Sequence, residues 1–241
     1  MAGIEIHARI TAAPDTIGEV RRLAAAIVDR AGVSGSGVAR CDWFVSEARH
    51  ECVAMIEHAS NESLLAHHAA TSAGDHYRAL LTQARGAMDV LGTLTDAARK
   101  ALGGYERREY DYADGLGGVA AECGPAAPIE IYTGFVVQPG QLALFKRYAL
   151  ELTDVVRAGD PGTARYDWFY DDAHDACIAM DTYVDSAAMF THIKNCHAAH
   201  EKLLTLSTMT TEFLGELPAE AMQAVSKYSP YVVRYLCGLR S

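Results

Sequence analysis

Residues 40–44 read Arg-Cys-Asp-Trp-Phe, and residues 165–169 repeat this segment with one change, as Arg-Tyr-Asp-Trp-Phe. The same offset of 125 positions relates Ile4-Glu5-Ile6 to Ile129-Glu130-Ile131 and His67 to His192. Between residues 4 and 67, 18 of 64 positions are identical in the second copy, including both tryptophans of the chain. A match this long at a constant offset indicates that one structural unit occurs twice.

The segment between the two copies is rich in glycine, alanine and proline, a composition typical of linkers. We therefore predict a first repeat over residues 1–114, a linker over 115–128, and a second repeat over 129–241.

Each copy carries the same succession of patterns. Strands are predicted at 4–11, around Trp43, at 51–58 and at 87–91, with helices at 17–29 and through His67. The second copy gives strands at 129–137, around Trp168, at 176–183 and at 210–214, with helices at 142–156 and through His192. The order β-α-β-β-α-β is that of the ferredoxin-like unit, in which both helices cover one face of an antiparallel sheet.

The third predicted strand of each copy is apolar on both of its faces, as Cys52, Val53, Ala54 and Met55 illustrate. Helices cover only one face, so the other face also needs cover. We expect an α+β protein whose two ferredoxin-like repeats pack sheet to sheet as an intramolecular barrel, with a cavity between them.

Composition narrows the classes of function. The formal net charge of −10 disfavours nucleic acid and anionic membrane surfaces as partners. No apolar run reaches the about 20 residues that span a bilayer, and the first residues do not read as a secretion signal, so we expect a cytoplasmic protein. The six cysteines are scattered and are expected to be reduced.

The stretch from Tyr166 to His192 resembles the antibiotic biosynthesis monooxygenase family of the dimeric α+β barrel superfamily. The resemblance rests on an aromatic second strand, a hairpin, a third strand with an acid and an aromatic residue, and a histidine on the following helix. It covers both repeats, and it implies the barrel fold more strongly than any one reaction. The chain would be a tandem version of a protein that ordinarily pairs two copies.

The resemblance also nominates catalytic residues. In the second repeat, Asp181, Tyr183 and His192 occupy the positions of the acid, the aromatic residue and the histidine. In the first repeat, His58 and His67 occupy the last two positions, and Ile56 replaces the acid. Because only the second repeat keeps the acid, we expect two unequal half-sites, with the second the more active.

Each candidate also has a structural interpretation. His67 and His192 could accept a proton near neutral pH, or could bond the first turn of a helix. Asp181 could be a base with a raised pKa in an apolar chamber, or a solvated acid at the rim. Trp43 and Trp168 could stack on an aromatic substrate, or could be core residues.

We predict no cofactor and no metal. His192, Cys196 and His200 form one stripe along a helix, but three ligands spaced in this way reach too far for one ion. No phosphate-binding or dinucleotide-binding motif occurs.

The resemblance implies a cofactor-independent oxygenase that uses O2 and a planar aromatic substrate such as a quinol or a polyketide phenol. Two alternatives stay open: a non-catalytic module that binds a small molecule or haem, and a cyclase or isomerase of the same superfamily. A homodimer of the tandem chain is also possible.

Overall fold

The computed structural model describes residues 3–33, 37–72, 76–116, 128–226 and 230–239. The chain divides into two compact units, one of residues 1–110 with 233–241 and the other of residues 111–232. Strands β5 (Glu106–Gly115) and β10 (Tyr231–Gly238) each contribute residues to both units. Most of the predicted linker, residues 117–127, lies outside the described residues.

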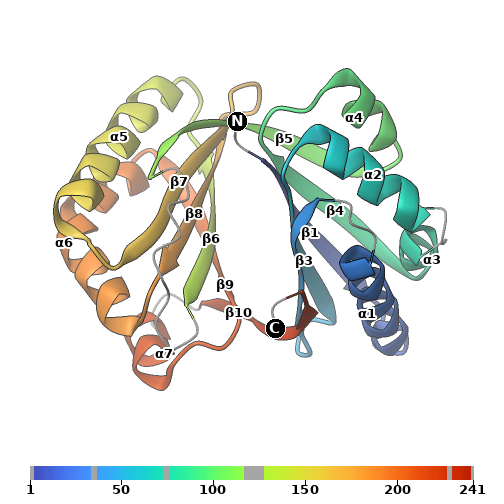
Figure 1. Cartoon of the computed structure of the whole chain (residues 1–241). Coiled ribbons are helices and arrows are strands. Elements are labelled where there is room, and N and C mark those ends of the chain that lie inside the picture. Colours follow the sequence, from blue (N-terminus) through green and yellow to red (C-terminus); the bar gives the residue numbers. More distant parts are fainter. Residues whose placement is uncertain (1–2, 34–36, 73–75, 117–127, 227–229, 240–241) are drawn as a thin grey trace. The chain divides into compact units, whose positions relative to one another are not determined.

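Unit 1 follows the predicted order and adds elements to it. It contains β1 (Ile4–Ala12), α1 (Ile17–Val33), β2 (Val38–Ser46), β3 (Glu51–His58), α2 (Asn61–Ser72), α3 (His76–Gln83), β4 (Ala84–Leu91) and α4 (Asp96–Ala101). The second predicted helix is thus followed by another, α3, before β4. In Figure 1, helices α1, α2 and α3 lie on the same side of the strands of this unit.

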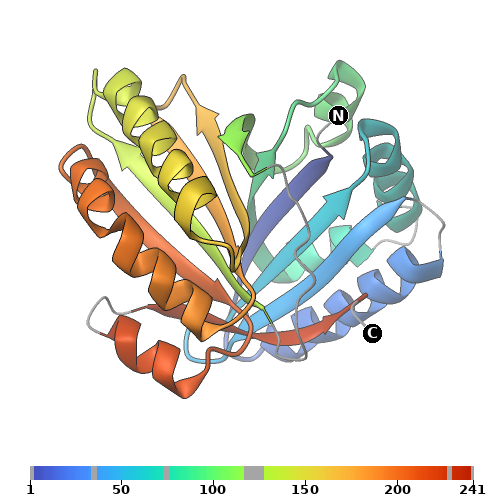
Figure 2. The same ribbon diagram turned by 60° about the vertical axis from the view of Figure 1, so that its left-hand side comes forward.

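Unit 2 repeats this plan with a single long second helix. It contains β6 (Ile129–Val137), α5 (Leu142–Gly159), β7 (Thr163–Asp171), β8 (Ala176–Tyr183), α6 (Ser186–Leu204), β9 (Ser207–Leu214) and α7 (Ala219–Val225). Helices α5 and α6 lie side by side along the strands, drawn in yellow and orange in Figure 2.

The strands pair in the order β1-β3-β2-β10-β9-β6-β8-β7-β5-β4 and form a closed barrel, since β4 also pairs with β1. Among the described residues, the ladder between β4 and β5 is parallel and the other ladders are antiparallel. The predicted class, an α+β barrel built from two ferredoxin-like repeats, is confirmed.

The strand registers show how closely the second copy repeats the first. Trp43 pairs with Ala54 on β3, and Trp168 pairs with Ala179 on β8. Beside each tryptophan, an arginine of the strand binds a buried aspartate, Arg40 to Asp42 at 2.7 Å and Arg165 to Asp167 at 2.9 Å. These pairs compensate the charge of each buried carboxylate.

The two β-hairpins at 46–51 and 171–176 also match. His50 and Asp175, the last residues of the two turns, both adopt a positive φ, of 52° and 49°. Histidine and aspartate adopt this left-handed conformation more readily than β-branched residues do. These two turns reverse the chain between β2 and β3 and between β7 and β8.

Within the described part of the chain, none of the helices combines the length and the apolar character that a membrane crossing requires.

Candidate functional site

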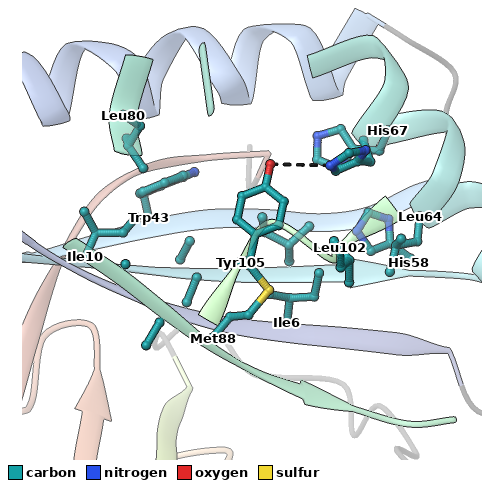
Figure 3. A pocket seen from close by; sticks show the side chains of 16 residues that line it. Ile6, Ile10, Trp43, His58, Leu64, His67, Leu80, Met88, Leu102 and Tyr105 are labelled. Atoms are coloured by element: carbon teal, nitrogen blue, oxygen red, sulfur yellow. Dashed lines mark hydrogen bonds between the residues drawn. The ribbon is translucent and has the colours of Figure 1, made fainter. Parts of the chain in front are cut away.

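A cavity of about 60 Å³ lies within unit 1, between one face of its sheet and the helices. A single water molecule needs about 10–15 Å³ and a cavity that binds benzene measures about 150 Å³, so this cavity has room for several waters, and an aromatic ring enters it only if lining side chains move. The sequence predicted a cavity between two sheets, whereas this one lies between the sheet and the helices of a single repeat. Figure 3 shows its lining: Ile6, Ala8, Ile10, Trp43, Ala54, Ile56, His58, Leu64, His67, His68, Leu80, Gly86, Ala87, Met88, Leu102 and Tyr105.

Small residues on the sheet make room for this cavity. Ala8 and Ala54 form part of its wall, and Gly86 of β4 pairs with Ile10 of β1. In unit 2, the pair that corresponds to Ile10 and Gly86 is Phe135 and Met209.

A third position also carries a larger side chain in unit 2 than in unit 1. Tyr166 of unit 2 stands where unit 1 has Cys41. Phe135 and Tyr166 are buried in the core of unit 2, and Met209 packs against it. Larger side chains therefore fill in unit 2 the space that unit 1 leaves open.

His58 and His67 are the principal ionisable groups of the cavity. His58 ends β3 and His67 lies on α2; both are 3% exposed, and their ring centroids are 5.2 Å apart. Burial lowers the pKa of His58 to about 3, helped by the neighbouring His67. Burial likewise lowers the pKa of His67 to about 4. The lining includes no carboxylate, so both imidazoles are neutral at pH 7.

A tyrosine and a histidine add a second polar feature. The hydroxyl of Tyr105 lies 3.4 Å from Nε2 of His68, and the two rings meet edge to face. Figure 3 shows Tyr105 reaching across the cavity between Trp43 and His67. Tyr105 was not among the residues nominated from the sequence, because the motifs of the resemblance end at the histidine of the second helix and Tyr105 lies beyond α4.

The nominated residues of unit 2 pack against one another. The ring of His192 lies between those of Tyr166 and Tyr183, with centroids 5.2 Å from each. Trp168 packs on Phe135 and on Tyr166 and is 1% exposed. In this unit the tryptophan is a core residue, whereas Trp43 also lines a cavity.

Asp181 is a buried acid rather than a solvated one. It is 9% exposed, and burial raises its pKa to about 7 against the opposing effect of Arg165. Its Oδ1 has no hydrogen-bond partner among the described residues. A carboxyl in this state can hold or release a proton near neutral pH.

The carboxylate that contacts His192 is Asp160, not Asp181. Nδ1 of His192 lies 3.0 Å from Oδ2 of Asp160, and both residues are buried. Sequence reasoning missed this contact because Asp160 lies in the turn after α5, at a position where the first repeat has Gly35.

We predict that acid destabilises the fold through its buried histidines. The folded pKa values of His58 and His67 lie below the ordinary value of 6.5, so the unfolded chain binds more protons as pH falls below 6.5. Stability is then complete above pH 6.5 and declines by up to about 1.4 kcal/mol per pH unit for each histidine. Thermal melts between pH 7 and pH 5 should show a falling Tm, because the two histidines together outweigh Asp181, whose raised pKa of about 7 makes its protonation stabilise the fold over the same range. His67→Gln should flatten this dependence, and an unchanged slope in that variant would contradict the prediction.

Solved structures with the same fold were found by comparison. A "Putative monooxygenase" from Fusobacterium nucleatum subsp. nucleatum ATCC 25586 matches with a TM-score of 0.61 at 12% identity, over 87% of this chain and 90% of that chain. A "putative monooxygenase" from Lactobacillus acidophilus NCFM matches with a TM-score of 0.58 at 12% identity, over 88% and 92%. An "anthrone oxidase-like protein" matches with a TM-score of 0.53 at 13% identity, over 88% and 90%.

This chain therefore has the fold of proteins described as monooxygenases, as the resemblance in its sequence predicted. The neighbours extend over nearly the whole tandem chain, and not over one repeat alone. No family model matches the sequence, and no curated protein matches it.

Proposed function

We propose that the chain is a cofactor-independent monooxygenase-like enzyme that oxidises a compact, planar phenol or quinol in the cavity of unit 1. The observation that carries the proposal is the pairing of an apolar cavity with two buried, neutral histidines, His58 and His67. The descriptions of the structural neighbours support an oxygenase, and the name of one of them supports an aromatic substrate.

The lining of the cavity favours an aromatic ligand. Its walls are aliphatic side chains and the aromatic residues Trp43 and Tyr105, and polar atoms come mainly from histidines. A planar ring can stack on these aromatic groups while its hydroxyl faces an imidazole.

The reaction needs a base and a dry site. A neutral imidazole, that of His67 or His58, accepts the phenol proton; the phenolate beside it supplies the negative charge that stabilises the resulting imidazolium. The phenolate transfers one electron to O2, and the radical and superoxide combine at the carbon para to the oxygen. The hydroperoxide takes back the proton and loses water, so that phenol and O2 give quinone and water. The protein contributes positioning and exclusion of solvent.

Oxygen uptake tests this proposal. The full chain is incubated with 1-naphthol under air, and separately under argon, with the substrate-free protein as the control. We expect O2 uptake and one naphthoquinone formed per O2, and with ¹⁸O2 one labelled oxygen in each quinone. Ligand binding without O2 uptake would favour the binding module, and conversion under argon would favour a cyclase or isomerase. Either result would overturn the proposal.

A further inference from the structure

Unit 2 holds a cluster of three buried side chains that the proposed reaction does not use. Asp160 follows α5, and His192 and Cys196 lie one turn apart on α6. Their exposed fractions are 4%, 5% and 2%. The stripe seen in the sequence thus gains a third donor from outside the helix, Asp160, in place of His200.

The three donor atoms lie at the corners of a small triangle. Oδ2 of Asp160 is 3.0 Å from Nδ1 of His192 and 3.9 Å from Sγ of Cys196, and that sulfur is 3.7 Å from the same nitrogen. Tetrahedral zinc, with bonds of about 2.0–2.1 Å to nitrogen or oxygen and about 2.3 Å to sulfur, separates such donors by about 3.3–3.6 Å. Each separation therefore needs to change by only a few tenths of an ångström.

The surroundings hold these donors in place. Nδ2 of Asn195 donates to Oδ1 of Asp160 at 2.6 Å, which leaves Oδ2 directed at the histidine. The rings of Tyr166 and Tyr183 enclose that of His192. Groups that orient the ligands in this way are typical of metal sites.

A fourth polar group lies beside the cluster. Tyr166 is 1% exposed, and its hydroxyl has no hydrogen-bond partner among the described residues. A buried hydroxyl without a partner is costly, and a water bound to an ion would offer it one.

We propose that Asp160, His192 and Cys196 form a binding site for a zinc-class divalent cation, with the fourth position left to water. A donor set of one oxygen, one nitrogen and one sulfur suits Zn²⁺ or Co²⁺, whereas Mg²⁺ and Ca²⁺ prefer oxygen alone. Binding replaces the proton between His192 and Asp160 by the ion and removes the proton of the Cys196 thiol. The inference does not rest on the proposed oxygenase, whose cavity lies in unit 1.

Cobalt provides a direct test on the full chain after treatment with a chelator. Titration with Co²⁺ should show that one ion binds per chain. The absorption spectrum should contain a thiolate-to-cobalt charge-transfer band in the near ultraviolet, and visible bands with the intensity typical of four-coordinate cobalt. Zn²⁺ should displace the cobalt and raise the Tm. Absence of the charge-transfer band, or binding only at millimolar cobalt, would overturn the proposal.

Variants assign the ligands. Cys196→Ser should abolish the charge-transfer band, and Asp160→Asn should weaken binding by about 100-fold or more, since both keep the shape of the side chain. His200→Gln, on the same helix but outside the cluster, is the matched control and should leave the spectrum unchanged. A band that persists in Cys196→Ser would place the ion elsewhere. If a variant fails to fold, X-ray absorption on the zinc-loaded wild type decides, because one sulfur ligand is expected.

Discussion

His67→Ala is expected to lower the turnover of 1-naphthol by about 10²-fold or more, the usual contribution of a positioned acid or base. His67 is buried in the cavity of unit 1 beside His58, where a phenol hydroxyl would meet an imidazole. His192→Ala, its counterpart in unit 2, is expected to cost less than about tenfold, because His192 is enclosed by Tyr166 and Tyr183.

This order is the reverse of the one expected from the sequence, in which the second repeat keeps the acid. The location of the cavity is the reason for the change. Steady-state kinetics of both variants, with circular dichroism as the control for folding, make the comparison. His67→Gln serves as a second variant that keeps a polar side chain of similar volume. A large loss in His192→Ala with none in His67→Ala would move the reaction to unit 2.

Gly86→Met is expected to abolish binding and turnover while leaving the protein folded. Methionine is the residue that unit 2 has at this position of the sheet, as Met209, where it lies opposite Phe135. A side chain of four heavy atoms added at Gly86 projects into a cavity of about 60 Å³ and removes most of the space for a ligand.

A graded series makes this prediction sharper. Gly86→Ala should weaken ligand binding less than Gly86→Val, and Gly86→Val less than Gly86→Met, in step with the volume added. Isothermal titration with 1-naphthol measures the affinity, and Gly104→Ala, an open position with no atom near its added Cβ, is the control. Unchanged affinity across the series would show that the ligand binds outside this cavity.

The sequence alone determined the architecture of the chain. The repeat at an offset of 125 residues and the alternation of apolar positions predicted the bounds of β3, β6 and β8 as the structure has them. Such patterns are local, because the residues within a strand or turn determine its conformation largely independently of the rest of the chain. The sequence did not predict α3, nor the fifth strand of each repeat, β5 and β10.

Only the tertiary structure decided which candidate residues share a site. The resemblance nominated five residues together: His58, His67, His192, Asp181 and Tyr183. Of these five, His58 and His67 line the cavity of unit 1. That space depends on Gly86, which no motif marks, because a cavity is the result of which side chains meet across strands.

The contact between His192 and Asp160 is likewise set by the tertiary structure. Asp160 is 32 residues away in the sequence and has no counterpart acid in the first repeat. The turn after α5 brings it against α6, and the packing of these two helices fixes the contact. Periodicity specifies which face of a helix is buried, but the residue that meets that face comes from the packing of distant segments, which only the folded chain determines.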